Sequence, residues 1–489
     1  MVNFPQQICN WINGQEIPSQ GGAWFSKLNP CNGQTLCQVT RSQAEDVATA
    51  VDVARKQFTV AWSEIPPVQR GEILHNLVLG LKARQEEIAK IVAAETGKSF
   101  ASALGETQGA IALGLFYASE GQRLYGRTTT SAVPHKHALT VRQPLGVAGL
   151  IIAANTPIAN VAWKVFPALI CGNTAVLKAA EDTPITAWIF GQIAQEAGLP
   201  PGVLNIIQGY GEEAGAPLVA HQDIDIISFT GSTAVGRQIQ TVAGPSLKRI
   251  SLELGGKNPL VVCDDADLDN AVNWTILSAF SNAGQRCAAG SRIIIFESIY
   301  DQFRDLLVAK TKQLKVGPKD TDDLGPVINN KQLQQMLRAI ATARANGAKI
   351  LSGGDRLTDS EHQDGYYLAP TLLENISPEA AISQTELFGP IAILYSVPDF
   401  NSALALANNS PYGLTASIHT GNLHRAIRFC EKVQAGVAVV NGGTYGSEPH
   451  MPFGGFKQSG NGTREPGTEA LDVYSELKDI YINIDPNYV

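Results

Sequence analysis

The chain has 489 residues, of which 44% are hydrophobic and 17% are charged, and its 37 basic and 45 acidic side chains give a net charge of −8. This composition is typical of a water-soluble globular protein, and the length predicts two to four domains. Because the charge balance is acidic and no basic run occurs, nucleic acid and anionic membrane surfaces are excluded as expected partners.

The N-terminal sequence MVNFPQQICNWINGQE lacks a basic segment followed by an apolar one, and no unbroken apolar stretch elsewhere is long enough to span a membrane. We therefore expect a cytoplasmic protein with no membrane partner. The seven cysteines are scattered and odd in number, which favours reduced thiols over disulfides. None forms a Cys-x-x-Cys pair, so we expect no metal.

The first expected elements are two amphipathic helices that follow a short strand-like segment. Ser42 and Glu45 have the spacing of a capping box, and apolar residues then recur at helical spacing over 47–58. A second helix is expected after the Pro-Pro pair at 66–67, with an apolar face over 73–81.

Between residues 145 and 255 the sequence alternates short, β-rich apolar runs with segments of helix length. The runs are GVAGLIIAA, TAVLKAA, VLNIIQG, DIISFTG and RISLELGG. This alternation predicts a parallel sheet covered by helices on both faces, whose ligands bind at the carboxyl ends of the strands. A second α/β region is expected over 257–457, with a helix from 298 to about 314. The final segment, DIYINI, is expected to form a strand suited to extend a neighbouring subunit's sheet.

Two residues are candidates for chemistry on their local sequence alone. Cys287 lies in NAGQRCAAGSR, a loop of small residues where a thiol can be reached, although a buried structural cysteine is the ordinary alternative. Glu253 ends an apolar run just before two glycines, where a carboxylate is costly to bury unless it is paired or useful. The ordinary alternative for Glu253 is a solvated glutamate at a strand end.

Several motifs occur together in a fixed order. LELGGKN at 252–258 and GQRC at 284–287 are accompanied by ETGK, VLKAAEDTP, SFTGSTAVG, TELFGP and PFGGFKQSG. Over essentially the whole chain, this set resembles the aldehyde dehydrogenase superfamily. The resemblance implies an α/β fold with a Rossmann-type cofactor-binding domain, an α/β catalytic domain and a small β oligomerisation arm. The corresponding boundaries are 1–122 and 145–256 for the first, 257–458 for the second, and 123–144 with 470–489 for the arm.

The resemblance also implies roles for individual residues. Cys287 matches the family's nucleophile, Glu253 its general base, and Asn155 the residue whose amide, with the cysteine main-chain N–H, holds the oxyanion. Lys164 and Glu465 match a remote pair that relays protons away from the base, although Thr463 is an extra residue in the motif before Glu465.

A second set of matches concerns the cofactor. The matching residues are Lys178 and Glu181 for the adenosine ribose, Gly231, Ser232 and Gly236 for the pyrophosphate, and Glu386 and Phe388 for the nicotinamide ribose and ring. A carboxylate beside the ribose accepts hydrogen bonds from its hydroxyls and repels a 2′-phosphate. The expected cofactor is therefore NAD, with NADP as the alternative.

The implied function is oxidation of a small-molecule aldehyde to the carboxylic acid through a thioester on Cys287. Two alternatives remain, namely a dehydrogenase of semialdehydes or phosphorylated aldehydes that uses NADP, and a non-catalytic binding protein on the same fold. Ala153 and Ala154 stand where most hydrolytic members have Pro-Trp, which predicts a reshaped pocket wall. The expected substrate contacts are Arg286, Tyr445 and His450, with an exposed loop histidine as the equal alternative for His450.

The resemblance further implies a homo-oligomer, either a dimer or a tetramer. The segment GRTTTSAVPHKHALTVRQP is consistent with an arm, because its Thr- and Val-rich halves flank a proline as the strands of a hairpin would.

Overall fold

The computed structural model describes residues 4–488, and its first large element is a seven-stranded sheet with the order β12-β11-β8-β9-β10-β2-β3. The five strands from β12 to β10 are parallel, as the five apolar runs predicted. Their bounds are β8 (Val147–Ile151), β9 (Thr174–Lys178), β10 (Leu204–Ile207), β11 (Ile226–Thr230) and β12 (Arg249–Glu253), while β2 (Asn10–Ile12) and β3 (Gln15–Ile17) add antiparallel strands at one edge.

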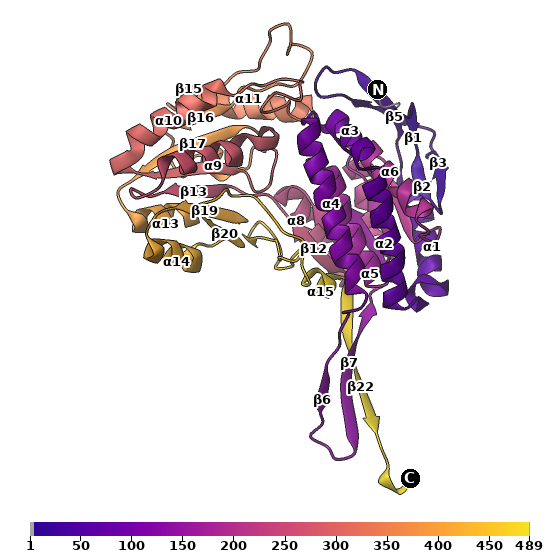
Figure 1. The fold of residues 1–489 in the computed structure, drawn as a ribbon. Coiled ribbons are helices and arrows are strands. Elements are labelled where there is room, and N and C mark those ends of the chain that lie inside the picture. Colours follow the sequence, from indigo (N-terminus) through magenta and orange to yellow (C-terminus); the bar gives the residue numbers. More distant parts are fainter. Residues whose placement is uncertain (1–3, 489) are drawn as a thin grey trace.

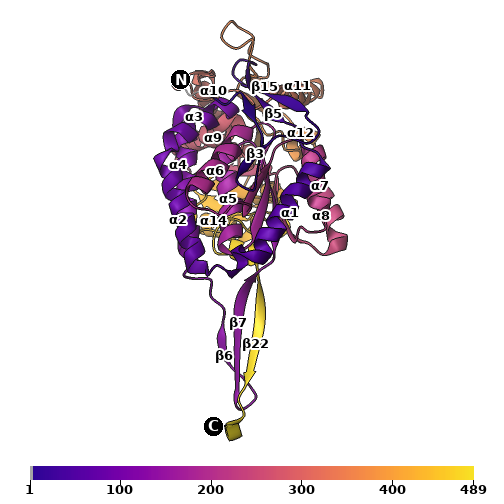
Figure 2. The same ribbon diagram turned by 90° about the vertical axis from the view of Figure 1, so that its right-hand side faces the viewer.

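Helices cover both faces of this sheet (Figure 2). One face carries α2 (Pro67–Ala83), α3 (Gln85–Thr96), α4 (Phe100–Glu120), α5 (Pro157–Ile170) and α6 (Pro184–Glu196). The other face carries α1 (Ala44–Val60), α7 (Ala216–Ala220) and α8 (Thr233–Ala243).

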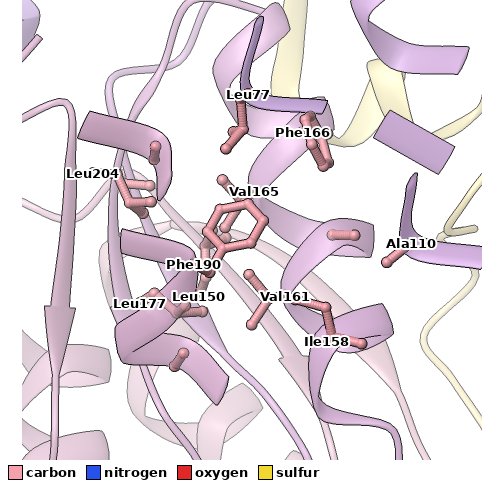
Figure 3. Close-up of a cluster of buried hydrophobic side chains, with 14 of the residues drawn as sticks. Leu77, Ala110, Leu150, Ile158, Val161, Val165, Phe166, Leu177, Phe190 and Leu204 are labelled. Carbon is pink, nitrogen blue, oxygen red and sulfur yellow. The ribbon is translucent and has the colours of Figure 1, made fainter. Parts of the chain in front are cut away.

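The strands of the first sheet are apolar on both sides because each side packs against helices. Leu150, Leu177 and Leu204 point toward α5 and α6, where Phe190 packs among them (Figure 3). The next residue along β8, Ile151, belongs to the cluster on the opposite face. This two-sided burial explains the unbroken apolar runs in the sequence.

The predicted helix over 47–58 is present, but its cap lies one residue further along. The helix begins at Ala44 with Gln43 as N-cap, and the main-chain N–H of Gln43 donates to Asp46 Oδ2 at 2.9 Å. Ser42 instead donates to Asn10 Oδ1 on β2 at 2.9 Å. The capping box proposed at Ser42 and Glu45 is therefore wrong, because a long-range contact takes the serine hydroxyl.

The second large sheet has the order β15-β16-β17-β14-β13-β19-β20, and all but β15 run parallel. Its strands are β13 (Asn258–Val262), β14 (Gly290–Phe296), β15 (Lys349–Ser352), β16 (Thr371–Glu374), β17 (Ile391–Val397), β19 (Thr415–His419) and β20 (Val437–Val440). Its helices are α9 (Leu268–Phe280), α10 (Tyr300–Gln313), α11 (Asn330–Ala345), α12 (Ala381–Gln384), α13 (Phe400–Asn408) and α14 (Leu423–Lys432). The helix expected from residue 298 is α10, which a single 3-10 turn precedes.

A long arm projects from the body, and the C-terminus lies at its far end (Figure 1). The arm is a three-stranded sheet of β6 (Thr128–Thr130), β7 (Lys136–Pro144) and β22 (Ser475–Asn483), in the order β22-β7-β6. The hairpin predicted around Pro134 is thus present, and the C-terminal strand pairs antiparallel with β7 of its own chain. The helix α15 (Ala470–Tyr474) leads into this strand.

Two small sheets complete the fold. One contains β1 (Gln7–Ile8), β4 (Trp24–Leu28) and β5 (Thr35–Thr40), and the other pairs β18 (Tyr412–Gly413) with β21 (Phe456–Lys457). Within residues 4–488, no helix has both the length and the apolar character needed to cross a membrane.

The strand order places the carboxyl ends of several parallel strands at one edge. The chain moves from β8 through β9 to β10 on one side and then returns to β11 on the other, so a topological switch point lies between β8 and β11. The segment after β21 returns from the second sheet to β12, where the N–H of Leu254 donates to the carbonyl of Ser459 at 3.0 Å. The candidate site therefore lies between the two large sheets.

Candidate active site

Cys287 lies in a strained loop that leads into β14. The three residues Asn282, Ala283 and Gly284 have φ angles of 54°, 52° and 66°, which is a left-handed conformation that L side chains seldom adopt. A Cβ added to Gly284 would lie only 2.2 Å from the carbonyl oxygen of Gly389. The loop thus needs glycine at this position and packs directly against the loop after α12.

Side chains from other elements hold this loop in place. The Nδ2 of Asn258, at the start of β13, donates to the carbonyl oxygens of Cys287 at 2.7 Å and Ala289 at 2.9 Å. The Gln285 side chain is buried and accepts a hydrogen bond from the N–H of Ile328 at 2.8 Å. Preorganised support of this kind is what a nucleophile needs.

Asn155 is joined directly to the cysteine loop. It follows β8, and its Nδ2 donates to the carbonyl oxygen of Gln285 at 3.0 Å. Its own carbonyl oxygen accepts hydrogen bonds from Lys98 Nζ at 2.8 Å and Asn282 Nδ2 at 3.3 Å. The structure therefore brings Asn155 and the cysteine loop together, as the sequence predicted.

Glu253 ends β12 and is buried, with 4% of its surface exposed. Neither of its carboxyl oxygens has a hydrogen-bond partner among the described residues. Burial raises the pKa of Glu253 well above its ordinary value, and the Glu465 carboxylate adds to the effect, while Lys164 and Arg464 oppose it. A carboxyl group kept without partners is unusual in a folded protein and marks Glu253 as a functional candidate.

The pKa of the Cys287 thiol lies above its ordinary value. Burial raises the pKa of Cys287 to about 12, and the nearby carboxyl groups of Glu386 and Glu253 contribute in the same direction. Because the thiolate is the reactive form, Cys287 needs a proton acceptor when it attacks. Because the Glu253 carboxyl group contributes to the raised pKa of Cys287, the two side chains lie in the same site.

Lys164 and Glu465 form a fully buried pair, with Lys164 Nζ 3.0 Å from Glu465 Oε2. Ser228 connects them, because its Oγ accepts from Lys164 Nζ at 2.7 Å and donates to Glu465 Oε1 at 2.8 Å. Ser251 and Tyr474 also donate to Glu465 Oε1, both at 3.1 Å. The extra residue near Glu465 thus leaves the predicted pair intact, and these three hydroxyls are partners that the sequence did not indicate.

The adenosine-ribose candidates lie together at the end of β9. Lys178 Nζ donates to Glu181 Oε2 at 2.8 Å, and the Glu181 side chain is 43% exposed. Burial tends to raise the pKa of Glu181, but Lys178 outweighs it and the pKa is lowered. Glu181 is therefore an ionised carboxylate that solvent can reach.

The glycine-containing turn after β11 opens helix α8. Ser232 is its N-cap and accepts a hydrogen bond from the N–H of Val235 at 3.4 Å, while the serine side chain remains exposed. A Cβ on Gly236 would lie 2.6 Å from Leu254 Cδ2, so glycine lets α8 lie close to the end of β12. Together with Gly231, this places the N-terminus of a helix of 11 residues at the carboxyl edge of the sheet.

Glu386 and Phe388 lie on the loop that contacts the cysteine loop. Glu386 Oε1 accepts from the N–H of Gly256 at 3.1 Å, and burial raises the pKa of Glu386 to about 7 against the effects of that hydrogen bond and of Lys257. Phe388 has a φ angle of 55°. Both residues line a small cavity that Arg286 and Lys257 also border.

The predicted substrate residues have different surroundings. The Arg286 guanidinium lies 4.9 Å from the centre of the Tyr445 ring, and its buried Nε has no hydrogen-bond partner among residues 4–488. Tyr445 packs at the edge of an apolar cluster that includes Cys287. His450 is exposed and lies 3.6 Å from Glu448, so the structure does not bring it into that cluster.

Two aromatic residues beside Cys287 were missed in the sequence. Trp163 and Phe453 pack edge to face, with ring centres 5.5 Å apart, and both belong to the cluster around Cys287. Two signals were available, namely the position of Trp163 beside Lys164 and that of Phe453 within the motif PFGGFKQSG. Within residues 4–488, no three His, Cys, Asp or Glu side chains gather as the ligands of a metal would.

Comparisons with known proteins identify the family of this chain. The model of the aldehyde dehydrogenase family matches residues 17–480. The chain is 38% identical to the alpha-ketoglutaric semialdehyde dehydrogenase of Bacillus subtilis over 485 residues, which cover 99% of each protein. It is 39% identical to human retinal dehydrogenase 2 over 481 residues, which cover 97% of this chain and 91% of that protein.

A solved structure extends the agreement to the whole fold. The betaine aldehyde dehydrogenase of Staphylococcus aureus in complex with NAD+ superimposes with a TM-score of 0.96 at 31% identity, covering 99% of this chain and 96% of the other. The α/β fold predicted from the sequence is therefore confirmed, and this chain belongs to the aldehyde dehydrogenase family.

Proposed function

We propose that the protein oxidises an aldehyde to the carboxylic acid with NAD, using Cys287 as nucleophile, Glu253 as general base and Asn155 as oxyanion donor. The observation that carries this proposal is the convergence of the three at one edge of the first sheet. Asn155 is bonded to the cysteine loop, and Glu253 is buried nearby without a hydrogen-bond partner in the described chain. A structural role gives no reason to keep a buried carboxyl group unpaired.

The residues at the carboxyl edge of the first sheet fit a dinucleotide. The N-terminus of α8 offers free N–H groups for a pyrophosphate, and the accessible carboxylate of Glu181 can accept hydrogen bonds from ribose hydroxyls. When bound, the nicotinamide supplies a hydride acceptor. Because Glu181 is ionised, it disfavours a 2′-phosphate, so we propose NAD rather than NADP.

In the first half of the reaction, the Cys287 thiol gives its proton to water, and its sulfur forms a bond with the aldehyde carbon. The amide of Asn155 and the main-chain N–H of Cys287 then stabilise the negative charge on the aldehyde oxygen. Loss of hydride from that carbon restores the carbonyl group and leaves a thioester on Cys287.

In the second half, Glu253 takes a proton from the water that attacks the thioester carbon, and the acid leaves as the Cys287 sulfur regains a proton. The proton on Glu253 must then leave a buried site. The Lys164–Ser228–Glu465 network lies close enough to alter the pKa of Glu253, which supports a role for Lys164 and Glu465 in moving this proton.

The surroundings of Arg286 favour an aldehyde that also carries a carboxylate as the substrate class. Arg286 precedes the nucleophile and keeps a buried N–H without a protein acceptor in the described part of the chain. Such a group is suited to a substrate carboxylate or phosphate. The Bacillus subtilis relative is named for a semialdehyde, whereas the human relative is named for retinal, so the names alone do not choose between substrate classes.

The division of the chain follows from the same proposal. We assign 1–122 with 145–256 to cofactor binding, 257–458 to the nucleophile, and 123–144 with 470–489 to an arm that joins subunits in a dimer or tetramer. Exposed apolar side chains on β22, such as Leu477 and Ile482, support the last assignment. A cytoplasmic location stays a prediction from the sequence.

The test is NADH formation with a panel of short aliphatic, long aliphatic, aromatic and carboxylate-bearing aldehydes, with Cys287→Ala as the matched control. We expect turnover with at least one class, and none in the variant. Preference for carboxylate-bearing aldehydes that disappears in Arg286→Gln would support the acidic substrate class. NAD binding without turnover of any aldehyde would instead favour a non-catalytic binding protein, and turnover that survives in Cys287→Ala would remove Cys287 as the nucleophile.

A further inference from the structure

Lys98 and Glu106 form a buried ion pair next to the segment that carries Asn155. Lys98 Nζ is 2.6 Å from Glu106 Oε2, and the two side chains are only 5% and 6% exposed. Lys98 immediately precedes Ser99, the N-cap of α4, and Glu106 lies about two turns further along the same helix. Removing both charges from water is expensive, so the fold retains this pair against a considerable desolvation cost.

The second hydrogen bond of each partner points to the same short segment. Lys98 Nζ also donates to the main-chain oxygen of Asn155 at 2.8 Å. The other oxygen of Glu106 accepts from the main-chain N–H groups of Ile158 at 3.1 Å and Ala159 at 3.4 Å. The ion pair is therefore hydrogen-bonded to the main chain at Asn155 and again at Ile158 and Ala159.

Glu106 acts as the cap that α5 lacks locally. The N-cap residue, Thr156, makes no side-chain capping bond, and Pro157 has no N–H to donate. The carboxylate of Glu106 satisfies two of the remaining free N–H groups and lies where the helix dipole favours a negative charge. The N-terminus of α5 is thus capped by a side chain of α4, Glu106, and not by a residue of its own segment.

The opposite side of Asn155 is held by the cysteine loop, through the hydrogen bonds to Gln285 and from Asn282. Asn155 is consequently hydrogen-bonded both to Lys98, at the start of α4, and to the loop that carries Cys287. Of the two donors to its carbonyl oxygen, Lys98 makes the shorter bond, at 2.8 Å against 3.3 Å for Asn282.

We propose that Lys98 and Glu106 are positioning residues that hold the Asn155 amide where the oxyanion forms. This inference rests on the role proposed above for Asn155. Without the Lys98 bond, the carbonyl oxygen of Asn155 keeps only the longer bond from Asn282, so the peptide between Asn155 and Thr156, and with it the direction of the Asn155 amide, is held less firmly. Because misplacement of a catalytic group by about 1 Å can cost roughly 100-fold in rate, we expect a 10- to 100-fold slower acylation in variants that lack the Lys98 donor.

The experiment compares Lys98→Met, Glu106→Gln and the double variant in single-turnover NADH formation, with an aldehyde that the wild type oxidises. Melting temperature and NAD affinity are measured on the same samples.

Lys98→Met leaves the Glu106 carboxylate buried and unpaired, so it should lower both melting temperature and acylation rate. The double variant removes both charges but keeps a side-chain oxygen that accepts hydrogen bonds from the start of α5. We therefore expect its melting temperature to recover toward that of the wild type. Its acylation should remain slow, and its NAD affinity should be unchanged. Recovery of the acylation rate together with the melting temperature would overturn the inference, because the pair would then be merely structural.

A cycle with Asn155→Ala separates this inference from the proposed function. If Lys98 acts through Asn155, Lys98→Met should slow acylation by less than about twofold in the Asn155→Ala background. Multiplicative effects would overturn the positioning role and leave the function of Asn155 standing. An unchanged acylation rate in Asn155→Ala itself would remove the proposed oxyanion donor, and the inference with it.

Discussion

At the scale of single residues, the structure shifts the pKa values of carboxyl groups of the same type in opposite directions. Glu181 is ionised beside Lys178, while Glu253 and Glu386 are buried and have raised pKa values. The cause is the local balance of burial and charge, and not the residue type. Each carboxyl group is therefore suited to a different task.

The raised pKa of Glu253 predicts how thioester hydrolysis depends on pH. Since the proton is held more tightly than by an ordinary glutamate of pKa 4.5, the basic form should increase with pH well above that value. Hydrolysis of the preformed thioester should therefore speed up as pH rises through this range. Quenched-flow measurement starting from the thioester excludes the titration of Cys287, which no longer carries a thiol.

Glu253→Gln should slow hydrolysis by about 100- to 10,000-fold, which is the usual contribution of a general base. Acylation should be affected much less, so the variant should give a burst of NADH followed by slow turnover. The burst amplitude and the steady rate are read from one stopped-flow trace. An unaltered steady rate would count against Glu253 as the base.

Replacing Glu181 with Ser should raise the ratio of kcat/KM for NADP to that for NAD by about tenfold, which corresponds to roughly 1.4 kcal/mol. The change removes an ionised carboxylate that would repel a 2′-phosphate. Glu72→Ser, at an exposed position on α2, is the control for the loss of one negative charge. If both variants have the same cofactor ratio, Glu181 does not contact the ribose.

At the scale of elements, tight contacts between loops place the nucleophile. The loop before β14 runs through three left-handed residues and touches the loop after α12 at Gly284 and Gly389. Backbone strain of this kind persists only where the surrounding structure enforces it. Here the side chains of Asn258 and Gln285 provide that support.

Gly284→Ala should disturb this arrangement, because it adds a Cβ at a positive φ and within 2.2 Å of a main-chain oxygen. We expect a loss of stability of about 1–3 kcal/mol and a large fall in kcat. Gly109→Ala, on the exposed side of α4 with nothing within 4 Å of the added atom, is the matched control and should be neutral or stabilising. Thermal melts and initial rates test both variants, and wild-type behaviour of Gly284→Ala would mean that the loop can relax.

At the scale of the whole molecule, the arm stands apart from the two large sheets (Figure 1). Its outer strand β22 exposes about half of the Leu477 and Ile482 side chains, at 49% and 50%. Alternate residues of a strand point to opposite faces, so Leu477 and Ile482 present apolar surface on both sides of the arm. Such surface on a projecting strand is typical of an interface.

Replacing Leu477 and Ile482 with Lys should lower the molecular mass in light scattering from that of an oligomer toward that of a single chain. Because both side chains are exposed on the arm, the fold of the body should be retained, as judged by far-UV circular dichroism. Lys478→Ser on the same strand is the control and should leave the mass unchanged. An oligomer that persists in the double variant would show that the subunits associate through another surface.

The sequence by itself determined the type and order of the main elements. Strands such as β8 and β9 are recognisable because they are buried on both faces, which demands unbroken apolar runs. The catalytic candidates Cys287, Glu253 and Asn155 were found by their motifs, which are local in sequence. The cap of α1 was misplaced by one residue because Ser42 is taken by Asn10, a partner from a distant strand.

Only the tertiary structure decided the surroundings of these residues. The contacts of Asn155 with Lys98 and Gln285 join residues 57 and 130 positions apart, and no local pattern encodes such pairings. The same holds for the absence of partners around Glu253 within the described chain and for the exclusion of His450 from the cluster around Cys287. The physical reason is that residue type and spacing are properties of a short segment, whereas burial, charge proximity and the resulting pKa values arise only when distant segments pack together.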